Sequence, residues 1–78
     1  MAEFRVHLGM SQQYVYTIFA ADVRDLYSIL RKRLNVPFGR IRRVKSAGKL
    51  PQGAFEVRVS WGGRRETILV VPIVKEKP

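Results

Sequence analysis

Apolar and polar residues alternate along the first segment of the chain, residues 3–8. Every second residue there is apolar, beginning with Phe4, which predicts a half-buried strand. Residues 9–13 then predict a turn. Residues 14–19 are all β-branched or aromatic, which favours a second strand that forms a hairpin with the first. Their apolar positions also fit helical spacing, so a helix is the alternative for this segment.

The clearest predicted helix runs from about Asp22 to Leu34. Asp22 suits the cap position because its side chain can accept a hydrogen bond from the first turn of the backbone. Asp25 suits the positive end of the helix dipole, and three cations occupy the last turn, at the negative end. Asn35 can take the left-handed conformation that closes a helix, and Pro37 prevents the helix from continuing. The helix is therefore predicted to end at about Leu34.

One apolar stripe on this helix is predicted to pack on the core. Its members recur at helical spacing, and the polar residues lie on the opposite side of the helix. The stripe consists of Val23, Leu26, Tyr27, Leu30 and Leu34.

Residues 40–46 predict a third strand with an irregularity. Ile41 and Val44 are three positions apart, so strict alternation would put them on opposite faces of a sheet. A bulge at the two arginines between them would bring both apolar residues to the core. Residues 47–53 contain two glycines and a proline and predict a loop.

Residues 55–61 alternate strictly, and Gly62–Gly63 permit the two-residue turn whose twist suits a β-hairpin. Such a turn fixes the register of the two strands. The predicted pairs are Trp61 with Arg64, Val57 with Ile68 and Phe55 with Val70 on one face, and Arg58 with Thr67 and Ser60 with Arg65 on the other. Residues 68–71 are apolar on both faces, so the last strand should be central in the sheet until Pro72 interrupts it.

These elements predict an α+β fold with the order ββαβββ, in which one helix packs across a face of one sheet in a β-grasp-like layout. Residues 1–74 form a single basic domain in this interpretation, and residues 75–78 form a polar C-terminal tail. The opposite face of the sheet then has no helix to cover it. Its side chains would be available to a partner.

The distribution of positive charge along the chain indicates what kind of partner the protein binds. The chain has 15 Lys/Arg and 6 Asp/Glu, a formal net charge of +9. Eight of the cations and none of the acids lie in residues 26–55, so one contiguous tract carries most of the excess. Such a field repels itself unless a polyanion neutralises it, whereas solvated surfaces normally mix both signs. Nucleic acid is therefore the partner that the sequence favours.

The predicted nucleic-acid contacts are arginines and lysines, whose side chains suit phosphate groups. They are Arg31, Lys32, Arg40, Arg42, Arg43, Lys45 and Lys49, with Arg58, Arg64 and Arg65 as secondary contacts. We favour RNA over DNA because no helix-turn-helix, zinc finger or basic zipper is present to enter a DNA major groove. Tyr14, Tyr16 and Trp61 could stack on bases, but a chain this short needs aromatic residues for burial, so we favour positions in or beside the core.

Several other classes of function receive no support. Cysteine is absent and His7 is the single histidine, so neither a thiolate metal site nor a cysteine nucleophile is possible, and no cofactor motif is found. We therefore predict a non-catalytic protein without a metal or cofactor. No apolar run approaches membrane-spanning length. The first eight residues lack a signal-peptide pattern, which favours a cytoplasmic protein. The composition is compatible with a thermophilic source.

A segment of alternating strands resembles a known family. Residues 53–60 and 66–71, together with the opening residues 3–6, are similar to the sheet of RelE-like ribosome-dependent toxins, although that family has two helices where this sequence predicts one. The resemblance implies an alternative function, a small ribonuclease that uses Arg and Lys to stabilise phosphorane charge. A second alternative is a protein-binding β-grasp module that exposes a sheet edge to a partner strand. The oligomeric state stays open.

Overall fold

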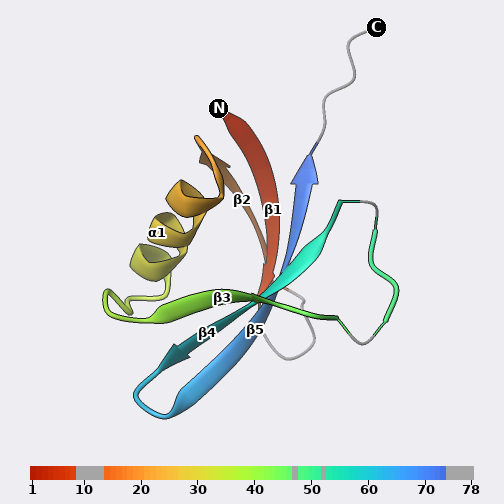
Figure 1. Ribbon diagram of the computed structural model, residues 1–78. Coiled ribbons are helices and arrows are strands. Elements are labelled where there is room, and N and C mark those ends of the chain that lie inside the picture. The colour runs from red at the N-terminus through yellow and green to blue at the C-terminus, as the bar shows by residue number, and fades with distance from the viewer. Residues whose placement is uncertain (9–13, 47, 52, 74–78) are drawn as a thin grey trace, which may run out of the picture.

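The computed structural model describes residues 1–8, 14–46, 48–51 and 53–73. The predicted α+β fold with the order ββαβββ is confirmed (Figure 1). The elements are β1 (Ala2–Leu8), β2 (Tyr14–Ala20), α1 (Val23–Arg33), β3 (Arg40–Val44), β4 (Phe55–Trp61) and β5 (Arg64–Ile73). The predicted turn at residues 9–13 and tail at residues 75–78 lie outside the described residues, as do Ala47 and Gln52 of the predicted loop.

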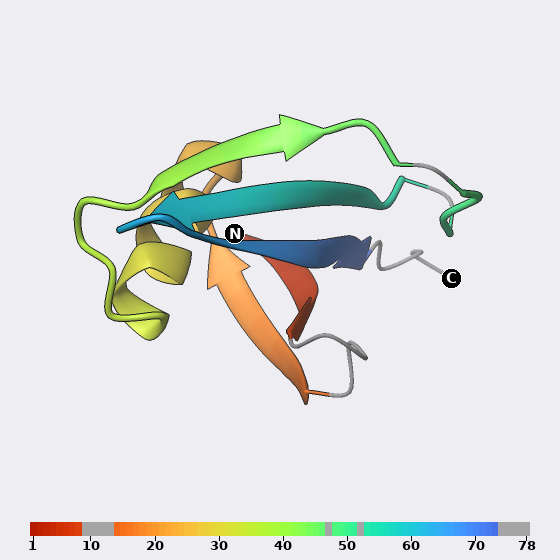
Figure 2. The same cartoon turned by 90° about the horizontal axis from the view of Figure 1, so that it is seen from below.

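The strands form one five-stranded sheet in the order β2-β1-β5-β4-β3, and neighbouring strands are antiparallel throughout. The sheet twists strongly, so that the β1–β2 ribbon runs at a steep angle to β3 and β4 (Figures 1 and 2). α1 connects the two edge strands, β2 and β3, and lies on one face of the sheet. Within the described residues no helix covers the other face, which we call the open face.

The strand prediction for residues 14–19 is confirmed, and its helical alternative is wrong. β2 pairs with β1 along its full length, from Leu8 opposite Tyr14 to Ala2 opposite Ala20. This register puts Ile18 beside Phe4 in the core. The β-branched and aromatic composition of β2 therefore decides its conformation, because these side chains pack well on a pleated surface.

Both predicted ends of α1 are confirmed. The Asp22 side chain accepts a hydrogen bond from the Asp25 backbone N–H at 2.8 Å, and the Asp25 carboxylate accepts one from the Ala21 N–H at 2.9 Å. These carboxylates satisfy backbone donors that have no partner within the helix. At the other end Leu34 caps the helix and Asn35 has a φ of 56°, the left-handed conformation that closes it.

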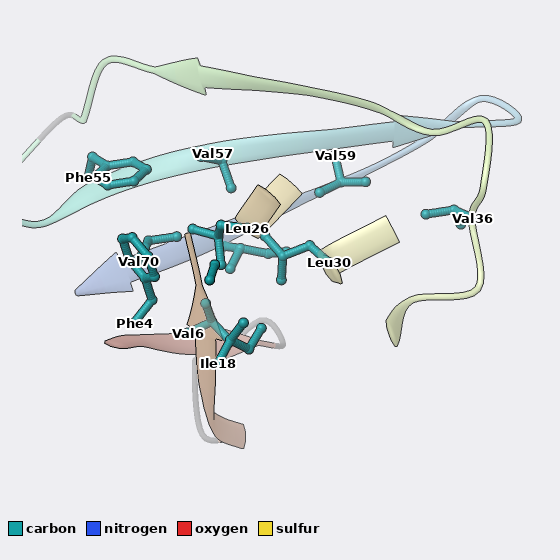
Figure 3. Close-up of a cluster of buried hydrophobic side chains, with 12 residues drawn as sticks. Phe4, Val6, Ile18, Leu26, Leu30, Val36, Phe55, Val57, Val59 and Val70 are labelled. Atoms are coloured by element: carbon teal, nitrogen blue, oxygen red, sulfur yellow. The ribbon is translucent and has the colours of Figure 1, made fainter. Parts of the chain in front are cut away.

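The core lies between α1 and the sheet. Leu26 and Leu30 of α1 are fully buried, and Figure 3 shows them between the side chains of β4 and those of β1 and β2. The buried side chains are Phe4, Val6, Ile18, Ala20, Leu26, Leu30, Val36, Phe55, Val57, Val59, Ile68 and Val70. The assignment of Val23 to the packed stripe is wrong: Val23 is 41% exposed. It is the first helical residue, one turn before Leu26, and only the middle of the helix is fully covered by the sheet.

The predicted bulge in β3 is also wrong. β3 pairs residue for residue with β4, from Arg40 opposite Ser60 to Val44 opposite Glu56. Ile41 therefore faces the core, while Val44 lies on the open face and stays half-buried there. Because β3 is an edge strand, it can leave an apolar residue off the core at little cost, and no irregularity is needed.

The β4–β5 hairpin has the predicted register, with Trp61 opposite Arg64 and Val57 opposite Ile68. Gly62 and Gly63 have φ of 50° and 78°, as a primed hairpin turn requires. β5 is central, between β1 and β4, as its apolar residues predict.

The prediction that Pro72 ends the last strand is wrong, because β5 continues through Pro72 to Ile73. β4 begins only opposite Val70. Beyond that residue β5 therefore has β1 as its single neighbour, an edge position in which a proline is tolerated.

Candidate nucleic-acid interface

Four arginines gather on the open face at its β3–β4–β5 end. Arg40 and Arg42 come from β3, Arg58 from β4 and Arg65 from β5. They share a face because each lies at an alternate position of its strand, in register with the others. We call these four residues the arginine cluster.

The register of the sheet holds these like charges close together. Arg42 lies directly opposite Arg58, and both Arg40 and Arg65 lie opposite Ser60, two positions along β4. Directly opposed side chains have Cβ atoms about 5 Å apart and diagonal neighbours lie about 7–8 Å apart, and like charges at these positions destabilise a sheet. Arg58 therefore has one direct and two diagonal cationic neighbours.

The cluster surrounds a shallow hollow of about 330 Å³. The described residues that line it are the four arginines and Ser60, and no carboxylate is among them. On the same face, Glu56 is the described acid nearest to Arg58, two positions away along β4. The hollow is thus a concave surface of high positive potential, suited to an anion.

The structure does not bring all the predicted contact residues together. Arg43 lies on the opposite face from Arg42, with its guanidinium carbon 4.8 Å from the centre of the Phe55 ring. Arg31 donates a hydrogen bond from Nε to the Gly39 carbonyl at 2.8 Å and so ties α1 to the segment before β3. These two cations have structural contacts that account for their positions.

The remaining predicted residues are exposed at other places. Lys32 lies on α1, Lys45 and Lys49 follow β3, and Arg64 begins β5 beside the hairpin turn. The contiguous tract at residues 26–55 is therefore divided in space, while Arg58 and Arg65, from outside the tract, join its β3 arginines. The pairing of β4 with β3 on one side and with β5 on the other, rather than nearness in sequence, creates the cluster.

A second hollow, of about 510 Å³, adjoins the first at the β4–β5 turn. It shares Arg40, Ser60 and Arg65 with the first hollow, and its other lining residues are Phe38, Trp61, Gly62, Gly63 and Arg64. Phe38 was not among the contact residues predicted from the sequence. Phe38 lies between Pro37 and Gly39, in a non-periodic segment directly before the basic strand, and this position could have identified it as an exposed aromatic residue beside the arginines.

The aromatic residues named from the sequence have different positions. Trp61 packs against the core at its edge, as we expected. The core assignment is wrong for Tyr14, which is 65% exposed, and for Tyr16, whose exposed ring lies 5.2 Å from the guanidinium carbon of Arg33. β2 is an edge strand, so these residues have a neighbouring strand on one side only.

Comparison with protein-family models, with curated proteins and with solved structures gives no match for this chain. Among the described residues, no group of three or more His, Asp or Glu side chains is placed to hold a metal ion. In the same part of the chain, no helix is long and apolar enough to cross a membrane. Any functional inference therefore depends on the arginine cluster and its two hollows.

Proposed function

We propose that this chain is a non-catalytic nucleic-acid-binding protein of the cytoplasm, with RNA preferred over DNA, and that the arginine cluster holds the phosphates. The observation that carries the proposal is the direct opposition of Arg42 and Arg58 across β3 and β4. A sheet is less stable with like charges opposed, so a bound anion would relieve the repulsion in an arrangement that adds further cations around this pair.

The chemistry of the cluster suits phosphate groups. The guanidinium group is planar, stays charged and donates several N–H groups in a fixed fork that matches phosphate oxygens. Each phosphate neutralised releases condensed counterions, which makes binding favourable at low salt and independent of base sequence. An extended polyanion can contact several arginines at once, so we propose nucleic acid rather than an isolated small anion. A role as a ribonucleoprotein component agrees with this mode of binding.

RNA is preferred because the structure offers a sheet surface rather than a free helix. α1 uses Leu26 and Leu30 to pack on the core, and its cationic last turn is tied back through Arg31. DNA major grooves are read chiefly by an inserted helix or a two-stranded ribbon, whereas several RNA readers use the face of a sheet.

The ribonuclease alternative receives less support from the same hollow. Four arginines could stabilise developing phosphorane charge, but general acid–base catalysis also needs a group that exchanges protons near neutral pH. The lining residues that the structure describes are arginines and one serine. We therefore place binding ahead of cleavage.

The test uses Arg42 and Arg43, which are adjacent in sequence but lie on opposite faces of the sheet. Arg42→Glu should weaken binding to unrelated RNA sequences about equally and should flatten the plot of log affinity against log salt by about 0.7 to 0.9 per lost phosphate contact. Arg43→Glu is the matched control: it makes the same charge change one residue away, on the other face, and should do much less. Affinity would be measured by fluorescence anisotropy between about 50 and 200 mM salt.

Two results would contradict the proposal. Equal losses from both variants would mean that only diffuse charge matters. No measurable binding at about 50 mM salt would remove nucleic acid as the partner and leave the protein-binding alternative, through an exposed edge strand.

A further inference from the structure

Phe38 is almost fully solvent-exposed, at 96%. It lies in the short segment between α1 and β3, next to the arginine cluster in sequence and in space. Isolated exposed apolar residues are common on protein surfaces and by themselves indicate nothing. The surroundings of Phe38 distinguish it from such residues.

The backbone on both sides of Phe38 is fixed. The Gly39 N–H donates to the Val36 carbonyl at 2.8 Å, and the Gly39 carbonyl accepts the bond from Arg31 Nε at 2.8 Å. Val36 is buried in the core, and a Cβ atom at Gly39 would lie only 3.0 Å from its Cγ2. The turn is therefore anchored tightly while the phenyl ring stays in solvent, which pre-organises the ring for a contact outside the chain.

Cations surround the ring. Phe38 lines the 510 Å³ hollow together with Trp61 and three arginines, Arg40, Arg64 and Arg65. Because this hollow shares Arg40, Ser60 and Arg65 with the hollow of the arginine cluster, phosphate sites and an aromatic ring form one continuous surface. An aromatic platform beside a cationic groove is how proteins hold unpaired nucleic-acid strands, with bases stacked on the rings and phosphates on the cations.

We infer that the interface takes single-stranded nucleic acid and that Phe38 stacks on an unpaired base. This inference deepens the proposed function and rests on it. In a duplex the faces of the bases are covered by their neighbours, so Phe38 could not reach them, whereas a single strand can turn a base onto the ring. The charge of the surrounding arginines favours a polyanion over an apolar peptide as the occupant.

The experiment compares one RNA in two forms: a labelled 12-nucleotide strand of mixed sequence, and the same strand annealed to its complement. Phe38→Ala should weaken single-strand binding about 5- to 150-fold, the range for one lost base–aromatic stack. It should leave duplex binding and the salt dependence unchanged, because no phosphate contact is removed. Phe38→Trp should retain single-strand affinity. Phe19→Ala, at an apolar residue that is 55% exposed on β2, is the control and should have no effect.

The outcomes separate this inference from the proposed function. If Phe38→Ala binds both forms like the parent chain, while Arg42→Glu still weakens both, the stacking role is wrong and the phosphate interface stands. Equal loss of both forms would show that Phe38 shapes the interface rather than stacks, which also overturns the inference. If the parent chain binds neither form, the proposed function fails and the inference fails with it. Unfolding curves check the fold, and Phe38→Ala should leave the unfolding midpoint unchanged.

Discussion

Replacing Arg58 by threonine should stabilise the protein and weaken its binding at the same time. Arg58 has Arg42 directly opposite and Arg40 and Arg65 as diagonal neighbours, so it experiences more like charge than any other member of the cluster. Threonine favours strands and would face Thr67 across β4 and β5. The substitution therefore removes the central charge and keeps the strand.

The expected gain follows from Coulomb's law. Unit charges about 7 Å apart repel by about 0.6 kcal/mol in bulk water. Three neighbours would give about three times this value, and attraction to Glu56, two positions along the same face, offsets one of them. The net gain is then about 1 kcal/mol at low salt, which raises the melting temperature of a domain this small by about 4–8 °C. In 1 M salt the Debye length falls to about 3 Å and the gain should vanish.

The measurement is thermal unfolding in about 10 mM and 1 M salt, without nucleic acid. Arg5→Thr is the matched control, because Arg5 also lies on the open face opposite a threonine, Thr17. Its neighbours on the same strand and face are Glu3 and His7 rather than arginines. At low salt Arg5→Thr should leave the melting temperature unchanged or lower it slightly, whereas Arg58→Thr should raise it.

A salt-independent effect of Arg58→Thr, or equal shifts from both variants, would refute the repulsion argument. A stabilised variant that binds RNA as tightly as the parent would separate the repulsion from the function. The cluster would then lose its role as the phosphate site, whatever its energetic cost.

The remaining predictions concern the fold. Leu30→Ala should destabilise the protein by about 2–5 kcal/mol, because Leu30 is fully buried between α1 and the sheet, and an unchanged denaturant midpoint would show that the core face is misassigned. Gly63→Ala should cost about 1–2 kcal/mol, because a φ of 78° is strained for alanine, whereas Gly48→Ala, at an open position without positive φ, should cost much less in the same unfolding assay.

Much of the fold could be predicted because its signals are local. Asp22 and Asn35 mark the ends of α1 through backbone chemistry that needs no tertiary context. Gly62–Gly63, between two alternating segments, fix the register of β4 and β5. The order of strands in the sheet has no such local signal. That order explains why β5 continues through Pro72, because β4 does not pair with this end of β5 and proline is tolerated at an edge position.

The candidate site was less predictable, because it depends on which side of each strand faces the helix. Requiring both Ile41 and Val44 to be buried introduced a bulge and hid the simpler alternation that puts Arg42 and Arg43 on opposite faces. Phe38 was missed for a related reason. Periodicity identifies residues within strands and helices, whereas Phe38 gains its significance from loops that adjoin only in the folded chain.

The position of β5 has a consequence for how the chain acquires its structure. β5 follows the other four strands of the sheet in the chain, yet it lies between β1 and β4, and its pairing with β1 joins Glu3 to Ile73. Until β5 is present, the β1–β2 hairpin and the β3–β4 pair have no strand between them, and the core valines of β4 and β1 lack their common neighbour. Pairing between strands so distant in sequence closes a large loop and slows folding. The sheet should therefore form late and in a single step, when β5 enters its centre.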